Sequence, residues 1–406
     1  MSTITQYRQD AQRIRILAAG CALQLFLGIL YVWSVFVEPV HAEYAWDVAS
    51  VKLTSSFMIS FFVLGILVGG NLQLKLGAQR VVLLGGLMLA AGMLITALLP
   101  AGAAFFMYVT YGVIGGFGVG AAYNAIITAA QKWFPERRGF ATGVSVCAFG
   151  FSTVIFAPLI EALIRQFGLR PTFFILAGAF CVVVLALFTF IRLPPDQGAA
   201  AGAAAPVAQP LDKKQYAMSE TIKTRQFYFI TLSLMLGTAA FFILNPSFKS
   251  LAAERGLDAS LGTAIVMLTG IANALGRLGA PLLSDKIGRE RADITILLTT
   301  AACALLLSFA SGFLFMAAIA MIAFCYGGFS GIYPVLTADY FGIKNVGSNY
   351  GAVMVGFALS ALTFPMVFGL ITNVIVKFII LSSLAAAGAV LVMLLIKSKK
   401  KGEAIE

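Results

Sequence analysis

The sequence predicts an all-α membrane protein with twelve transmembrane helices arranged as two six-helix bundles. Of its 406 residues, 60% are hydrophobic and only 11% are charged, whereas a typical soluble domain is roughly 25% charged. The apolar residues gather in runs of about 20 residues or more, which as helices cross a bilayer core of about 30 Å. A stretch rich in Ala, Pro and Gly separates these runs into two groups of six.

Twelve candidate spans can be drawn from the apolar runs. They cover approximately residues 15–40, 51–74, 80–100, 103–131, 138–165, 170–192, 225–249, 259–284, 291–310, 313–339, 347–372 and 374–397. The first run follows a polar segment that contains Arg8, Arg13 and Arg15. Its length predicts an anchor that stays in the protein rather than a cleaved signal peptide.

The distribution of basic residues predicts the orientation. Most of the 28 Lys and Arg residues fall on one side of the spans when the N-terminus is placed in the cytoplasm. The positive-inside rule therefore predicts a multi-pass protein of the inner cell membrane with both termini cytoplasmic. The net charge of +11 is then a topology signal. The expected partners are the lipid bilayer and a small anion; nucleic acid and an obligatory protein partner are not expected.

The halves are joined by a predicted cytoplasmic linker, residues 194–218, whose composition is typical of flexible segments. It separates an N-terminal six-helix bundle, 1–193, from a C-terminal six-helix bundle, 219–406. The halves echo each other, because LKLG at 74–77 recurs as DKIG at 285–288. Parallel repeats of this kind predict two bundles around one central cavity.

The sequence argues against an enzyme and against a bound metal or cofactor. All five cysteines lie inside apolar runs without metal-ligand spacing. The single histidine, His41, lies in a predicted loop. The Gly-rich stretch near residue 115 lies inside an apolar run, which indicates helix packing rather than a phosphate-binding loop.

One charge stands inside a span. Arg277 is the only charged residue between Ser260 and Ser284, and a charged side chain at bilayer depth costs from about 3 to about 15 kcal/mol. It therefore needs an acidic structural partner or an anionic ligand. None of the 17 acidic residues falls at mid-depth in the predicted spans, which favours the ligand. Asn273 lies one turn earlier on the same face, and the planar guanidinium matches a carboxylate bidentately.

The six-plus-six plan with DKIGR at 285–289 resembles the major facilitator superfamily. Within it, QKWFPERRGFATG (131–143), YVWSVFVEPV (31–40) and DYFGIKNVGSNYG (339–351) resemble the subgroup that joins bacterial oxalate/formate exchangers to monocarboxylate transporters. The likeness covers about residues 20 to 395. In the first copy of the loop motif, Leu74 stands where this superfamily has an Asp.

The resemblance implies transport of a small monocarboxylate, lactate- or pyruvate-like, by alternating access with a proton as the coupling ion. The resembling carriers have a proton-exchanging Asp four residues before the Arg, where this chain has Asn273. Glu38 or the substrate acid would then carry the proton. Oxalate-type exchangers have a Lys where this chain has Phe357, and one fixed cation suits a monoanion. An oxalate/formate-type exchanger and a non-transporting carboxylate sensor are the alternatives.

The resemblance also implies which side chains surround the substrate. Tyr31, Tyr123, Phe149 and Tyr326 match cavity-lining aromatic positions, and each could instead be an ordinary packing residue. The full predicted substrate-binding set is Arg277, Asn273, Tyr31, Tyr123, Asn124, Phe149, Tyr326, Ser330, Tyr333 and Phe357.

A separate pair is predicted to act as a conformational latch. Asp285 follows the eighth span and is expected to face the start of the fifth span, near Arg138 and Gly139. A helix N-terminus and basic side chains both favour an anion. The alternative is a solvated loop carboxylate.

Overall fold

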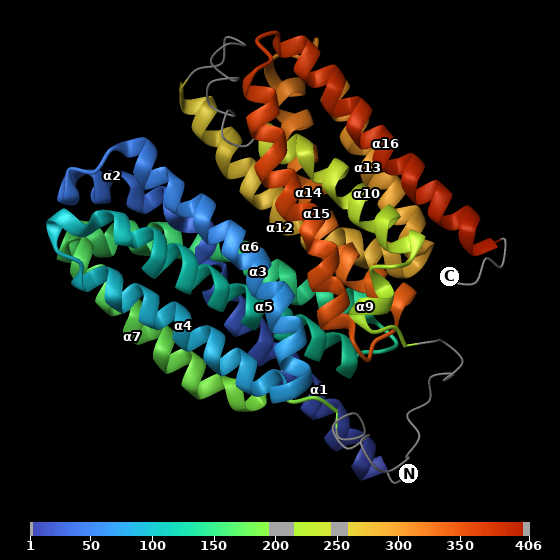
Figure 1. Ribbon diagram of the computed structural model, residues 1–406, viewed down its shortest axis with the longest axis horizontal. Coiled ribbons are helices and arrows are strands. Elements are labelled where there is room, and N and C mark those ends of the chain that lie inside the picture. Colours follow the sequence, from blue (N-terminus) through green and yellow to red (C-terminus); the bar gives the residue numbers. More distant parts are fainter. Residues whose placement is uncertain (1–2, 195–214, 245–258, 401–406) are drawn as a thin grey trace.

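The computed structural model describes residues 3–194, 215–244 and 259–400, and every regular element in these ranges is a helix. Figure 1 shows two groups of helices, one from the first half of the chain and one from the second. The prediction of an all-α membrane protein is confirmed by this architecture. Most of the predicted linker, 195–214, lies outside the described residues.

The elements of the N-terminal half are helices of several types. They are α1 (Thr3–Leu27), η1 (Gly28–Val32), α2 (Trp33–Tyr44), α3 (Val48–Leu76), α4 (Ala78–Leu98), η2 (Ala101–Phe106), η3 (Tyr108–Gly115), α5 (Gly116–Trp133), α6 (Arg138–Phe167), α7 (Leu169–Leu187) and η4 (Phe188–Phe190). The predicted first span is broken by the 3-10 segment η1, which separates α1 from α2. The fourth span begins with the π-helical segment η3 before α5.

The second half repeats the plan. Its elements are α9 (Met218–Thr221), α10 (Arg225–Leu244), α12 (Ala259–Ile287), α13 (Arg289–Leu306), α14 (Gly312–Phe341), α15 (Val346–Gly369) and α16 (Val374–Lys400). The repeated loop motif ends α3 at Gly77 and α12 at Gly288, with φ of 81° and 95°. Glycine adopts this left-handed backbone without steric cost, which explains why the motif keeps it in both halves.

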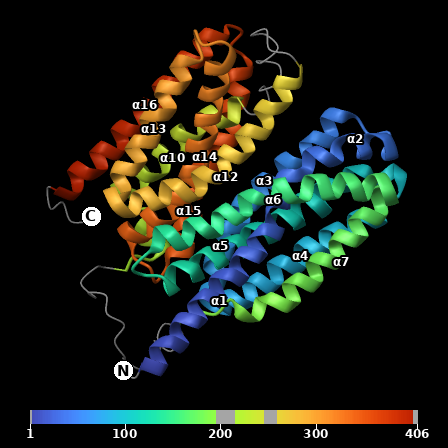
Figure 2. The same cartoon turned by 180° about the vertical axis from the view of Figure 1, so that it is seen from behind.

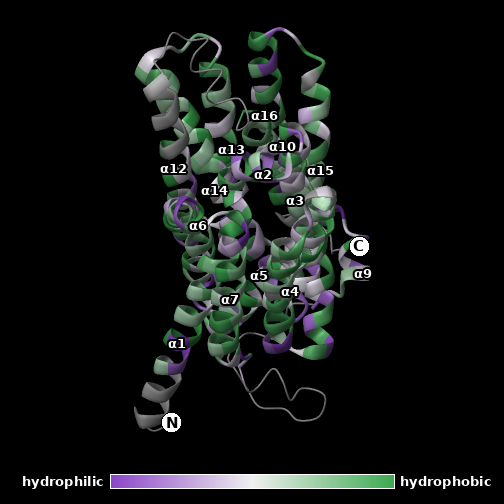
Figure 3. Cartoon of the chain, turned by 90° about the vertical axis from the view of Figure 1, so that its left-hand side faces the viewer, coloured by the Kyte–Doolittle hydropathy of each residue, from purple (hydrophilic) through white to green (hydrophobic). Residues whose placement is uncertain are grey.

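Ten helical stretches of the described residues are long and apolar enough to cross a membrane. Two further predicted spans, 259–284 and 291–310, correspond to α12 and α13. Large apolar side chains are exposed on the outer helices; on α7, Val182 is 67% exposed and Leu185 is 50% exposed. Figure 3 shows hydrophobic colouring along most of the helical length. Apolar groups exposed in this way suit contact with lipid.

The two halves meet most closely at the end of the molecule where α6 and α13 begin, which we call the Arg138 end. Figures 1 and 2 show the two groups of helices diverging from this end toward the end that carries α2. Ser348 Oγ on α15 donates a hydrogen bond to the Gly70 carbonyl on α3 at 2.9 Å. Residues from both halves also share one buried apolar core.

The last residues of the predicted linker are described, and they contact the C-terminal half. The Tyr216 backbone N–H donates to the Phe341 carbonyl at 3.0 Å. The Tyr216 carbonyl accepts from the side-chain amides of Asn345 and Asn349, at 2.9 and 3.1 Å. The chain is therefore attached to α14 and α15 before α9 begins. The domain boundaries 1–193, 194–218 and 219–406 stay a prediction.

Candidate functional site

Arg277 lies on α12, which packs backbone to backbone against α14. A Cβ at Gly276 would stand 1.9 Å from the Phe324 carbonyl oxygen, and one at Gly327 would stand 2.0 Å from the Asn273 carbonyl oxygen. Only glycine permits helices to approach this closely. The close contact fixes the position of the Arg277 backbone relative to α14.

The Arg277 side chain is only 1% exposed and reaches the other half of the molecule. Its Nε donates to Asn273 Oδ1 at 3.0 Å, and its Nη2 donates to the Tyr31 hydroxyl at 3.1 Å. The guanidinium carbon lies 5.5 Å from the Tyr31 ring centroid and 5.8 Å from that of Phe149. These distances allow cation–π attraction. Arg277 is thus held by polar groups and ring faces from both halves.

Within the described parts of the chain, no Asp or Glu forms an ion pair with Arg277. A buried charge without a counter-ion costs several kcal/mol, which hydrogen bonds to neutral groups offset only in part. Of the five N–H donors of an arginine, the structure accounts for two. The remaining donors suit a carboxylate oxygen, so the arrangement fits a small anion.

Two further predicted residues, Tyr123 and Tyr326, lie near the guanidinium. Phe149 contacts Tyr31 and Tyr123 edge to face, with ring centroids 5.6 and 4.9 Å apart. From the C-terminal half, Tyr326 stacks on Phe241 at 3.9 Å. Tyr31, Tyr123 and Tyr326 all lie within electrostatic reach of Arg277. We call Arg277, Asn273, Tyr31, Tyr123, Phe149 and Tyr326 the Arg277 cluster.

Phe357 lies beside this cluster rather than against the guanidinium. Its ring centroid is 6.1 Å from that of Tyr326 and 4.9 Å from that of Phe242. The side chain is 5% exposed. Phe357 therefore extends the aromatic wall of the C-terminal half. Ser330, on α14, is partly buried.

Two predicted site residues have other partners, and the structure places them outside the Arg277 cluster. The Asn124 amide donates to the backbone carbonyls of Ile66 and Gly347, at 2.7 and 2.8 Å. These hydrogen bonds join α5 to α3 and α15. The Tyr333 hydroxyl is bonded to Ser233 Oγ at 2.9 Å, deeper in the C-terminal half. Both polar groups are bound by protein atoms.

Sequence reasoning missed Tyr350 as a neighbour of the cluster. Tyr350 is 1% exposed on α15 and lies within electrostatic reach of Tyr123 and Arg277. It belongs to NYG at 349–351, which served only to carry the resemblance. The feature that could have indicated it is a tyrosine inside the predicted span 347–372.

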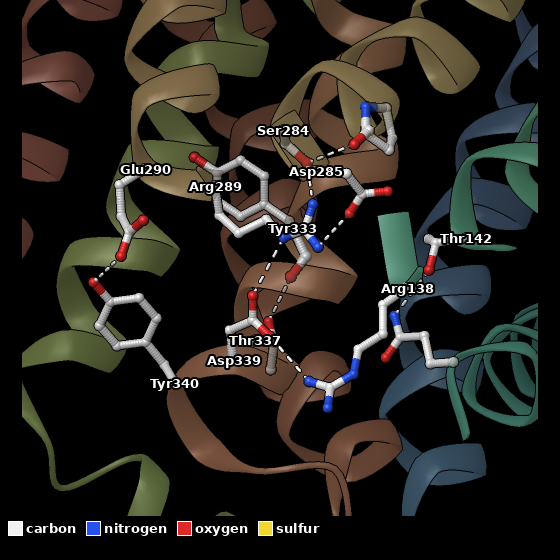
Figure 4. Close-up of polar contacts among 12 residues, drawn as sticks. Arg138, Thr142, Ser284, Asp285, Arg289, Glu290, Tyr333, Thr337, Asp339 and Tyr340 are labelled. Atoms are coloured by element: carbon white, nitrogen blue, oxygen red, sulfur yellow. Dashed lines mark hydrogen bonds and ion pairs between the residues drawn. The ribbon is translucent and has the colours of Figure 1, made fainter. Parts of the chain in front are cut away.

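The predicted latch residues lie at the Arg138 end, shown in Figure 4. Asp285 Oδ2 accepts a hydrogen bond from the Phe140 backbone N–H at 3.0 Å, in the first turn of α6. Asp285 Oδ1 also pairs with Arg289 Nη2 at 2.5 Å. The carboxylate therefore compensates both the N-terminal dipole of α6 and a guanidinium.

Arg138 has a different partner from the one expected, because its Nη1 lies 2.9 Å from Asp339 Oδ1. Asp339 Oδ2 in turn lies 3.2 Å from Arg289 Nε. Arg289 and Asp339 were not among the predicted latch residues, although both stand in quoted motifs. Together with Asp285 and Arg138 they form a network, the Arg138 network, that joins α6 to α12, α13 and α14 (Figure 4).

The fold and the buried Arg277 are those of a helical membrane protein, and the family match and the transporter relatives given below identify its class as a membrane transporter rather than an enzyme. The model of the Major Facilitator Superfamily matches residues 17–292 and 230–405, so the chain belongs to this superfamily.

Among curated proteins, the chain is 27% identical to an uncharacterized MFS-type transporter, YhjX, of Escherichia coli, over 84% of this chain and 83% of the relative. It is 25% identical to the oxalate:formate antiporter of Oxalobacter formigenes, over 80% of this chain and 76% of the relative. Among solved structures, the Major Facilitator Superfamily transporter FucP in the outward conformation has a TM-score of 0.72 at 16% identity, over 95% of this chain and 99% of that one.

Proposed function

We propose that this transporter moves small monocarboxylates of the lactate and pyruvate type by alternating access, with a proton as the coupling ion. The observation that carries the proposal is Arg277, a buried guanidinium with no acidic partner among the described residues. A carboxylate that reaches it gains charge-assisted hydrogen bonds in a low-dielectric setting. Arg277 belongs to the C-terminal half, whereas Tyr31 and Phe149 belong to the N-terminal half. A substrate bound here would therefore contact both halves at once.

A monoanion fits the composition of the cluster better than a dianion. The cluster contains one cation and several aromatic rings, and the nearby position 357 is a phenylalanine. A second carboxylate in this setting would be buried without a partner, which is strongly unfavourable. An aromatic wall suits the methyl group of lactate or pyruvate, while the tyrosine hydroxyls suit its second oxygen.

Alternating access gives the Arg138 network its proposed role. The orientation predicted from the positive-inside rule would put the Arg138 end in the cytoplasm. The network joins the two halves there, so it would have to open before substrate could leave to the cytoplasm. Transport would then consist of the two halves rocking about the Arg277 cluster.

Anion exchange is the alternative that a specific finding favours. One relative is named an oxalate:formate antiporter, and this chain has Asn273 where the resembling proton-coupled carriers have an Asp. A carboxylate sensor that does not complete the transport cycle is the remaining alternative. These functions differ in what drives uptake.

The test is uptake of labelled lactate, pyruvate, formate and oxalate into proteoliposomes, with and without an inward proton gradient. Proton symport predicts that the gradient drives accumulation of lactate or pyruvate in vesicles that contain no anion. Uptake that requires internal anion and ignores the proton gradient would favour exchange. Specific binding with no counterflow of any of the four anions would favour the sensor.

A further inference from the structure

Asp293 is a buried carboxyl group that the Arg277 cluster and the Arg138 network do not use. It lies in the second turn of α13 and is 0% exposed. Neither of its oxygens has a hydrogen-bond partner of normal geometry within the described chain. No described basic side chain forms an ion pair with it either.

The polar groups near Asp293 come from two neighbouring helices. The Tyr333 hydroxyl on α14 lies within electrostatic reach of the carboxyl. That hydroxyl shares a hydrogen bond of 2.9 Å with Ser233 Oγ on α10. Asp293 on α13, Tyr333 on α14 and Ser233 on α10 are thus successive neighbours.

Few titratable groups face this carboxyl. Besides Tyr333, Glu290 in the preceding turn of α13 is the one titratable group of the described chain that interacts with it. The Glu290 carboxylate accepts a hydrogen bond from the Tyr340 hydroxyl at 2.9 Å. Among the described residues of α10, α12 and α16, which also pack against α13, no charged side chain interacts with Asp293.

The surroundings favour the neutral form of Asp293. An ionised carboxylate that is fully buried and unpaired is costly, whereas a protonated one needs only a nearby acceptor for its O–H. The neighbouring Tyr333 hydroxyl oxygen can serve as that acceptor. An ionisable residue inside a membrane protein is most often part of an ion or proton pathway.

Asp293 lies close to the Arg138 network and is connected through α14 to the Arg277 cluster. It lies four residues after Arg289 of the Arg138 network, which is about 6 Å along a helix. Tyr333 lies seven residues after Tyr326 of the Arg277 cluster, about 10 Å along α14. Opening of the Arg138 end would therefore bring water near Asp293 while α14 links it to the substrate site. Glu38, the carboxylate considered from the sequence, is exposed on α2.

We propose that Asp293 binds the transported proton, an inference that rests on the proposed proton-coupled function. Its carboxyl carries the proton while the Arg138 end is closed, as in this structure. It releases the proton to water when that end opens and substrate leaves. Tyr333, held by Ser233, accepts the hydrogen bond of the neutral acid and orients it. In the release step the O–H bond of the carboxyl breaks and a water molecule takes the proton, which leaves a carboxylate; one proton thus moves with one monoanion.

The test compares Asp293→Asn with the wild type in proteoliposomes, in two assays. Lactate counterflow needs no net proton movement, so Asp293→Asn should keep it. Accumulation driven by a proton gradient should be lost. Glu290→Gln, one turn earlier on the same helix, is the matched control and should keep both activities.

The outcomes separate the inference from the proposed function. Wild-type protein without counterflow of lactate or pyruvate rejects the proposed function itself. If both the wild type and Asp293→Asn accumulate lactate when a proton gradient is applied, the role of Asp293 is overturned while the proposed function stands. An Asp293→Asn protein that fails to fold also overturns it, because Asn closely matches a neutral carboxyl in shape and polarity.

A spectroscopic measurement does not depend on transport. The infrared spectrum of the wild type should contain the carbonyl stretch of a buried, protonated carboxyl group, and Asp293→Asn should lack it. Tyr333→Phe should shift this band, because the hydrogen bond to the hydroxyl is removed. A wild-type spectrum in which Asp293→Asn removes no such band would overturn the inference.

Discussion

At the scale of single residues, the shape of the Arg277 side chain matters as much as its charge. We predict that Arg277→Lys loses most transport although the charge is kept. An ammonium is a compact point charge, so it cannot bond Asn273, Tyr31 and a carboxylate together as the planar fork does. Uptake of labelled lactate, with folding checked by size-exclusion chromatography, measures the loss. Near-normal uptake by folded Arg277→Ala would remove Arg277 from the site.

Phe357 tests the preference for a monoanion. We predict that Phe357→Lys weakens lactate transport and creates measurable oxalate binding. The new ammonium would lie beside Tyr326, where it lacks a partner until a second carboxylate arrives. Phe357→Met is the matched control, because it keeps a large apolar side chain and should bind no oxalate. If the wild type binds oxalate as tightly as lactate in a calorimetric assay, the one-cation argument fails.

The sequence could predict the centre of the candidate site better than its margins. Arg277 and Asn273 stood out because a charge inside a span is rare and one helical turn separates them. Asn124 looked equally suitable, yet its amide is bound by a carbonyl of residue 347, which is 223 positions away. A single sequence does not show which distant carbonyl a buried amide will meet. The bond between the Tyr333 hydroxyl and Ser233 and the burial of Asp293 likewise depend on contacts between helices that a single sequence does not show.

At the scale of helices, the guanidinium depends on how α6 packs against α12. A Cβ added to Gly150 of α6 would lie 2.9 Å from Arg277 Cδ and 3.2 Å from Nε. We predict that Gly150→Ala displaces the guanidinium and lowers lactate affinity, since overpacking at such a contact costs about 1–3 kcal/mol.

The matched control for Gly150→Ala is Gly178→Ala. Gly178 lies on the exposed face of α7, and an added Cβ there would meet nothing within 4 Å. Calorimetric titration with lactate should therefore give a lower affinity for Gly150→Ala than for Gly178→Ala. Equal affinity in both would mean that α6 does not position Arg277.

Helix existence followed from hydropathy, but the irregular segments did not. The predicted first span, 15–40, is interrupted by η1, which contains Tyr31. Within η1, a Cβ at Gly28 would stand 2.1 Å from the Phe149 carbonyl oxygen. The interruption thus occurs where α6 approaches and where Tyr31 turns to Arg277. The interruption coincides with a tertiary contact, which local periodicity does not contain.

At the scale of the whole molecule, the repeated plan was visible in the sequence, and the asymmetry between its ends was not. Repeats such as LKLG and DKIG predict two similar halves, and the structure has them. Which end is closed depends on pairs such as Phe140 and Asp285, 145 positions apart. The motif copy that carries Asp285 contributes to this closure, while the other copy has Leu74, which is 52% exposed.

The last prediction concerns the equilibrium between the closed and open forms of the Arg138 end. Asp285→Asn keeps an oxygen for the Phe140 N–H but removes the negative charge that opposes Arg289 and the α6 dipole. A charge at a helix N-terminus contributes roughly 1 kcal/mol, so the closed population should fall roughly fivefold relative to the open one. Lactate affinity should stay nearly unchanged, because Asp285 makes no contact with the Arg277 cluster.

Spin labels would be placed on α6 and α14 at the Arg138 end. The distances between them, measured by electron paramagnetic resonance, would report the closed and open populations of that end. Asp47→Asn is the matched control: Asp47 accepts a hydrogen bond from the Ser50 N–H at 3.0 Å and caps α3 within one half. Losing that charge changes a helix cap without touching the junction between halves, so the distance distribution should stay as in the wild type. A large loss of lactate binding in Asp285→Asn with unchanged distances would show that this carboxylate serves the substrate rather than the closure.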